Sequence, residues 1–80
     1  MDLQEFIGKF AEQFDDTDAG EFKGDTEFRK FEDWSSMTGL SIISMVDDEY
    51  GVTIKGDDIR NSKTIVDLFN VVKEKSLSVK

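Results

Sequence analysis

Residues 36–51, SMTGLSIISMVDDEYG, decide the fold class of this chain. Four apolar residues recur in this stretch at helical spacing: Met37, Leu40, Ile43 and Val46. The spacing predicts a helix over residues 36–50 with an apolar stripe facing a core. Gly51 is a residue type that commonly ends helices, so the helix is expected to stop there. Ile42 and Met45 lie beside the stripe and are expected to line the interior or to pack on the preceding loop.

Helical spacing also marks the first residues of the chain. Residues 2–14 predict an amphipathic helix, whose apolar positions are Leu3, Phe6, Ile7, Phe10 and Phe14. A long connection follows, from Asp15 to Ser35, in which residues 26–31 are expected to form a short helical turn. The connection carries four aromatic residues, expected to anchor it to the core: Phe22, Phe28, Phe31 and Trp34. A connection this long in a small domain is usually functional or packed as a unit, and these aromatics favour packing.

The last third of the chain predicts a short helix and a longer one. Residues 52–54 alternate in an extended link, and residues 56–61 predict a single helical turn that places Ile59 inward. The closing helix is expected over residues 64–75, with an apolar stripe at Ile65, Leu68, Phe69 and Val72. Thr64 and Asp67 have the spacing of a capping box, and Lys73 and Lys75 suit the negative end of the helix. We therefore expect one all-α domain over residues 1–80, a small four-helix bundle of three main helices and one short helix with a long first loop.

The composition excludes several classes of function. The chain has 80 residues and a net charge of −8, so it repels nucleic-acid phosphates and anionic membranes. It has no Cys and no His, which removes disulfides, thiolate nucleophiles, the usual general base and the commonest metal ligands. We therefore expect no enzyme. Acids at Asp2 and Glu5, where a secretory signal carries positive charge, favour a cytoplasmic protein, expected to be a monomer.

The acidic stretch between residues 15 and 27 does not fit a calcium loop. Such a loop needs oxygen ligands at positions 1, 3 and 5, Gly at 6 and Glu at 12. A register starting at Asp16 puts Gly20 at position 5, and one starting at Asp15 puts Ala19 there and Thr26 at 12. A solvated turn is the interpretation that remains.

Two serines, Ser35 and Ser36, directly precede the central helix. Serines there commonly cap the free N–H groups of the first turn. A serine at a helix N-terminus is also well placed to carry a phosphodiester, because the exposed N–H groups and the helix dipole favour an anion. Local chemistry leaves both interpretations open.

The order of motifs resembles the acyl carrier proteins. Residues 31–37, FEDWSSM, are similar to the segment that contains that family's Asp-Ser-Leu motif, which is followed by an amphipathic helix. Residues 46–54, VDDEYGVTI, are similar to the acids, aromatic, Gly and alternating apolar pair that come after the helix. The likeness continues through residues 56–61 into the closing helix and so covers nearly the whole chain. The motif at the serine is short, and its position within the four-helix pattern gives it weight.

The resemblance implies a carrier protein with 4′-phosphopantetheine covalently attached to a serine. This group is derived from coenzyme A. The matching residue is Ser36, followed by Met37 in place of Leu; Ser35 replaces the family's Asp. The arm would carry acyl or aminoacyl groups as thioesters between enzymes of fatty acid, polyketide or specialised biosynthesis. The implied partners are a phosphopantetheinyl transferase (holo-carrier synthase) and acyl-loading, acyl-transfer or ketosynthase enzymes with basic patches. The neutral residues Thr38, Ser41 and Ser44 favour a specialised pathway.

One face of the central helix is too polar for a core and is expected to bind partners. This face carries Met37, Ser41, Ser44 and Asp48. Together with the neighbouring acids Asp47 and Glu49, these residues form what we call the docking surface. Residues 31–54 contain five acids and no Lys or Arg, which complements a basic partner. The alternative function is an unmodified acidic interaction module of the same fold, which binds a basic protein through the three acids.

Overall fold

The computed structural model describes residues 2–14 and 17–78, and this part of the chain is all-helical. Four α-helices are present: α1 (Leu3–Ala11), α2 (Ser36–Tyr50), α3 (Gly56–Arg60) and α4 (Ile65–Ser78). The 3₁₀ turns η1 (Ala19–Glu21) and η2 (Phe28–Lys30) interrupt the first connection, and none of the described residues forms a strand. The predicted small all-α bundle, with three longer helices and one short helix, is confirmed.

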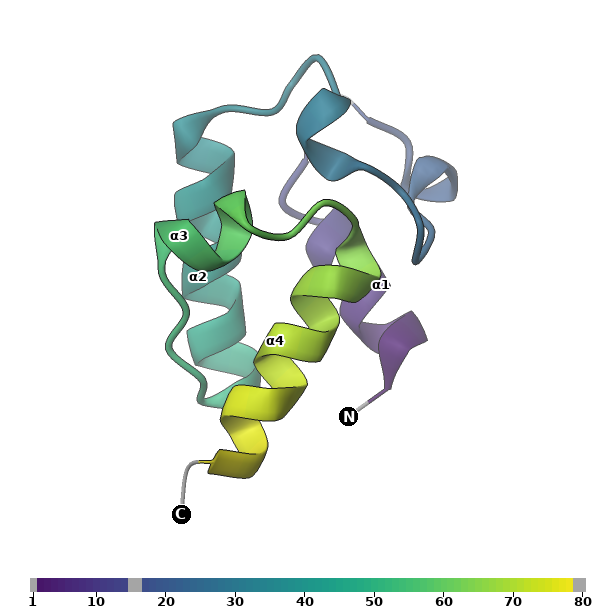
Figure 1. The fold of residues 1–80 in the computed structure, drawn as a ribbon. Coiled ribbons are helices and arrows are strands. Elements are labelled where there is room, and N and C mark those ends of the chain that lie inside the picture. Colours follow the sequence, from purple (N-terminus) through teal and green to yellow (C-terminus); the bar gives the residue numbers. More distant parts are fainter. Residues whose placement is uncertain (1, 15–16, 79–80) are drawn as a thin grey trace.

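The helices surround one core. α1 packs on α2 and α4, and α3 packs on the same two helices from another side. The long connection crosses one end of the bundle and leads into the N-terminus of α2 (Figure 1). Most of the core residues come from the predicted apolar positions of the helices, together with the extended link Val52–Ile54.

α1 ends three residues before the predicted boundary. After Ala11 the backbone forms shorter-range bonds, from Gln13 N–H to the Phe10 carbonyl (3.1 Å) and from Phe14 N–H to the Ala11 carbonyl (3.0 Å). The Gln13 side chain donates to the Lys9 carbonyl (3.1 Å), which gives one of the last helical carbonyls a partner. The chain therefore leaves the α-helical path after Ala11, yet Phe14 is still buried. The helical spacing of apolar residues thus extends three residues beyond the end of the helix.

α2 has the predicted bounds but a different buried face. Its buried residues are Gly39, Ile42, Met45 and Val46. The predicted stripe is wrong at two of its four positions, because Met37 is 77% exposed and Leu40 is 64% exposed. Gly39 lies on the buried side of α2, and the Trp34 indole packs against it, since a Cβ built on Gly39 would lie 3.7 Å from the ring, at ordinary van der Waals distance. Ile42 and Met45 face the interior, as one of the two predicted alternatives states.

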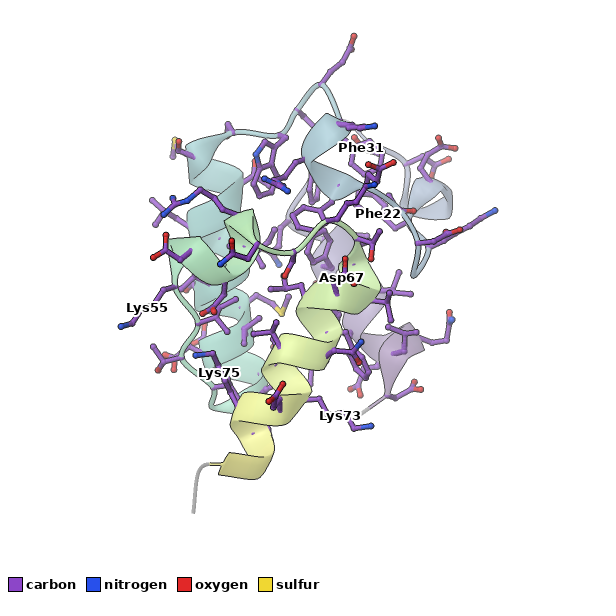
Figure 2. All side chains as sticks on the ribbon, in the orientation of Figure 1. Phe22, Phe31, Lys55, Asp67, Lys73 and Lys75 are labelled. Atoms are coloured by element: carbon purple, nitrogen blue, oxygen red, sulfur yellow. The ribbon has the colours of Figure 1, made fainter. Side chains whose placement is uncertain are left out.

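The aromatic residues anchor the long connection, as predicted. Phe28 is fully buried, and its ring lies 5.1 Å from that of Phe10 and 5.3 Å from that of Trp34, both edge-on. Phe22 and Phe31 lie together at the upper end of the bundle, with ring centroids 4.9 Å apart (Figure 2). The helical turn expected over residues 26–31 is the shorter turn η2.

Backbone hydrogen bonds join the connection to the first turn of α4. The N–H of Val66 donates to the Gly24 carbonyl (2.8 Å), and the N–H of Ile65 donates to the Thr26 carbonyl (3.2 Å). The predicted capping pair is confirmed, since the Asp67 N–H donates to Thr64 Oγ1 (3.3 Å) and the Thr64 N–H donates to the Asp67 carboxylate (3.0 Å). This backbone donor stabilises the charged carboxylate, which lowers the pKa of Asp67.

α4 extends beyond the predicted boundary, to Ser78. Lys73 therefore lies before the last turn, and Lys75 is the basic residue within it. The Lys75 ammonium also lies 3.6 Å from the carboxylate of Asp58 in α3. Both lysines lie along the lower half of α4 (Figure 2).

The rotation of α2 predicts opposite effects for two aliphatic residues of this helix. Ile42→Ala removes a fully buried side chain and should lower the free energy of unfolding by about 2–5 kcal/mol. Leu40→Ala removes an exposed side chain and should change it by less than about 0.5 kcal/mol. Urea denaturation measures both. If Leu40→Ala lowered the free energy of unfolding more than Ile42→Ala does, Leu40 would belong to the core, as expected from the sequence.

Candidate functional site

Ser35 and Ser36 have different structural roles at the start of α2. Ser35 is the N-cap: its backbone is extended, and its Oγ accepts a hydrogen bond from the Thr38 N–H (3.3 Å). Its Oγ also lies 3.2 Å from Thr38 Oγ1. Ser36 is the first helical residue, is exposed, and forms no side-chain hydrogen bond with any described residue. One hydroxyl is thus used by the fold, and the Ser36 hydroxyl is available for chemistry.

Contacts between the long connection and α2 fix the segment around Ser35 and Ser36. Thr38 Oγ1 donates to the Asp33 carbonyl (3.1 Å), and Thr17 Oγ1 donates to the Asp33 carboxylate (2.7 Å). The Trp34 ring packs on Gly39 one turn into the helix. The N-terminus of α2 is therefore fixed both by its cap and by the segment before it.

A hollow of about 450 Å³ lies beside Ser36, between α2, α3 and η2. Its size is within the range of about 300–1,000 Å³ typical of small-molecule sites. We call it the Ser36 hollow, and it is lined by Arg29, Trp34, Ser35, Ser36, Gly39, Leu40, Ile43, Gly56, Ile59 and Arg60. The lining is mainly apolar, with a guanidinium group supplied by η2 and another by α3.

The structure brings most of the docking surface together and separates one residue from it. Ser41, Ser44, Asp48 and Glu49 line a second hollow of about 270 Å³, whose other wall is α1. Met37 is exposed at the N-terminal end of α2. Asp47 lies two turns after Leu40 on the same side of the helix, the side that borders the Ser36 hollow, so it is turned away from the second hollow.

One acid of the docking surface is paired within the chain. The Lys9 ammonium of α1 lies 2.9 Å from the Glu49 carboxylate. The hydrogen bond to Glu49 raises the pKa of Lys9. Asp47 and Asp48 are exposed. Glu49 is thus partly neutralised before any partner arrives, and the other two acids carry most of the unpaired charge at this end of α2.

The next residue, Tyr50, faces inward. Its ring packs 5.9 Å from that of Phe6, and its hydroxyl is buried with no hydrogen-bond partner among the described residues. Burial disfavours the phenolate and raises the pKa of Tyr50. The docking surface therefore ends at Glu49.

Sequence reasoning missed three residues of the site: Leu40, Arg29 and Arg60. Leu40 was expected in the core. A second set of residues at helical spacing, Gly39, Ile42 and Val46, could have shown that the opposite choice of buried face leaves Leu40 exposed. The two arginines lie far apart in the sequence, and no motif links them.

No group of three or more acidic side chains in residues 2–14 and 17–78 is arranged to hold a metal ion. Asp15 and Asp16, the starting residues of the two calcium registers considered from the sequence, lie outside the described residues.

The different roles of the two serines predict different effects on stability. Ser35→Ala removes the N-cap and should lower the free energy of unfolding by about 0.5–2 kcal/mol. Ser36→Ala should change it by less than about 0.5 kcal/mol, because the exposed hydroxyl has no hydrogen bond to a described residue that the substitution would remove. Urea denaturation of both variants beside the wild type measures the difference. Equal losses would mean that the cap is not assigned correctly.

Comparison with protein-family models, with curated proteins and with solved structures finds no match to this chain. Within the described part of the chain, the helices are too short or too polar to cross a membrane.

Proposed function

We propose that the chain is an acyl carrier protein that receives 4′-phosphopantetheine from coenzyme A on Ser36. One observation carries the proposal: Ser36, exposed and with no side-chain hydrogen bond to any described residue, opens α2 beside the Ser36 hollow, while its neighbour Ser35 is used as the cap. The four-helix order and the long packed connection agree with the resemblance read from the sequence.

Ser36 has the properties that attachment of the arm requires. The Ser36 oxygen would bond to the phosphorus of the pantetheine phosphate while the P–O bond of the pyrophosphate linkage in coenzyme A breaks. Adenosine 3′,5′-bisphosphate would leave, and the hydroxyl proton would pass to a base of the transferase. The N-terminus of α2 favours the resulting phosphodiester, because its free N–H groups and its dipole are positive there. The bound arm supplies the thiol that this Cys-free chain lacks, on which acyl or aminoacyl groups are carried as thioesters.

The chain would perform no catalysis of its own. It would present its cargo to a phosphopantetheinyl transferase and to loading, acyl-transfer or ketosynthase enzymes in the cytoplasm, as a monomer. The exposed acids Asp47 and Asp48 support docking to basic surfaces, since complementary charge speeds and orients association. Met37, exposed next to Ser36, offers these enzymes an apolar contact.

The modification predicts a change of mass that depends on a single hydroxyl. The protein is incubated with coenzyme A and a broad-specificity phosphopantetheinyl transferase, and intact mass is measured. Wild type and Ser35→Ala should each gain one phosphopantetheine, and Ser36→Ala should gain none.

Two results of this mass experiment would change the proposal. A loss of modification confined to Ser35→Ala would move the attachment site by one residue. No gain with several transferases would contradict the carrier function and favour the acidic interaction module.

The docking surface predicts a kinetic effect of charge. Asp48→Lys should slow transfer of the arm by roughly tenfold at low salt, because it repels a basic partner. Met37→Ala should slow it as well, through loss of the apolar contact. Asp25→Lys is the matched control, because Asp25 is exposed on the connection near α4. Equal rates for Asp48→Lys and Asp25→Lys would exclude docking through this end of α2.

A further inference from the structure

The two arginines of this chain line the same hollow. Arg29 belongs to η2, and Arg60 is the last residue of α3, yet both side chains border the Ser36 hollow. The other cationic side chains of the chain are lysines. The fold thus concentrates the guanidinium groups beside the serine proposed to carry a phosphodiester.

The Ser36 hollow also differs in charge from the rest of this acidic protein. Among the residues that the structure describes, no Asp or Glu lines it, although the chain has 18 of them. By contrast, the hollow between α1 and α2 contains Asp48 and Glu49, and a third hollow, under the long connection, contains Glu32 and Asp33. Within the described residues, the wall of the Ser36 hollow therefore contributes two guanidinium groups and no carboxylate, and the acid Asp57 is the ion-pair partner of Arg60.

Neither guanidinium group is committed to a strong internal interaction. Arg29 is exposed and has no ion pair or hydrogen bond with the described residues. Arg60 pairs with Asp57, and both side chains are largely exposed. Exposed pairs of this kind contribute little to stability, so a well-placed anion can compete with Asp57 for the guanidinium group.

We propose that Arg29 and Arg60 bind the phosphate of a pantetheine arm and hold the arm over the Ser36 hollow. This inference rests on the proposed carrier function. A guanidinium group offers paired N–H donors that match two phosphate oxygens, which a lysine ammonium does not. Leu40, Ile43 and Ile59 provide an apolar floor for the pantetheine chain. The arm would then rest against the protein until a partner enzyme draws it away.

A titration of the unmodified protein tests the inference. Free 4′-phosphopantetheine and free pantetheine are added separately to ¹⁵N-labelled protein, and amide and guanidinium shifts are followed by NMR. The phosphorylated compound should bind roughly tenfold tighter, with shifts at Ser36 and Gly39 and at both arginines. Arg29→Gln/Arg60→Gln should abolish this difference in affinity.

The matched control is Lys30→Gln/Lys63→Gln, which removes the same charge at two exposed residues outside the Ser36 hollow. This variant should keep the preference for the phosphorylated compound. Equal binding of both compounds by the wild type, or the same loss in both double variants, would overturn the inference. Unperturbed amide shifts away from the Ser36 hollow show that a variant has kept its fold.

The titration does not require Ser36 to be modified, so its outcome is independent of the mass experiment. A preference for phosphate that depends on the arginines, in a protein that no transferase modifies, would support the arginine site and contradict only the covalent attachment. Modification without that preference would leave the carrier function standing and refute the role of the arginines.

Discussion

The packing of Phe28 between Phe10 and Trp34 is the contact on which the rest of the structure depends. It joins α1 to the long connection and, through Trp34 and Gly39, to the first turns of α2. A connection this long loses much conformational entropy when it is ordered, and burial of its aromatic rings offsets that cost. The position of Ser36 is therefore set by core packing at a distance from the residue itself.

α2 separates two kinds of surface. One flank carries the exposed serines and Asp48 of the docking surface. The other borders the Ser36 hollow, whose described lining residues include no acid. The N-terminus of the helix lies between them and carries Ser36. In the proposed carrier, this arrangement lets enzymes approach on the acidic side of one helix while the arm is held on the opposite side.

Periodicity predicted the helices well and their surroundings less well. The bounds of α2, the Gly51 stop and the Thr64–Asp67 capping pair followed from local chemistry that acts within a few residues. The rotation of α2 could not be predicted, because the stripes through Leu40 and through Ile42 have equally good helical spacing. Tertiary packing selects the buried face, on which Ile42 and Val46 join the common core and Gly39 contacts Trp34.

The candidate site shows the same division between local and tertiary information. Ser36 was predicted as the attachment residue because the resemblance matches it to the family's modified serine. The structure adds that its neighbour Ser35 is used as the cap, and the attachment itself stays a prediction. Arg29 and Arg60 border one hollow because the fold places η2 and α3 around the N-terminal half of α2, which no short sequence pattern encodes. The docking surface stays a prediction, with Glu49 already paired to Lys9.

Trp34 gives the protein a built-in optical reporter. It is the single tryptophan of the chain, and its indole lines the Ser36 hollow while packing on Gly39 and Phe28. Emission excited selectively at the indole absorption edge therefore originates from one place, next to the N-terminus of α2. Ligand entry, attachment at the neighbouring serine and release of the connection each change the polarity around that ring, so all three can be followed without an added dye.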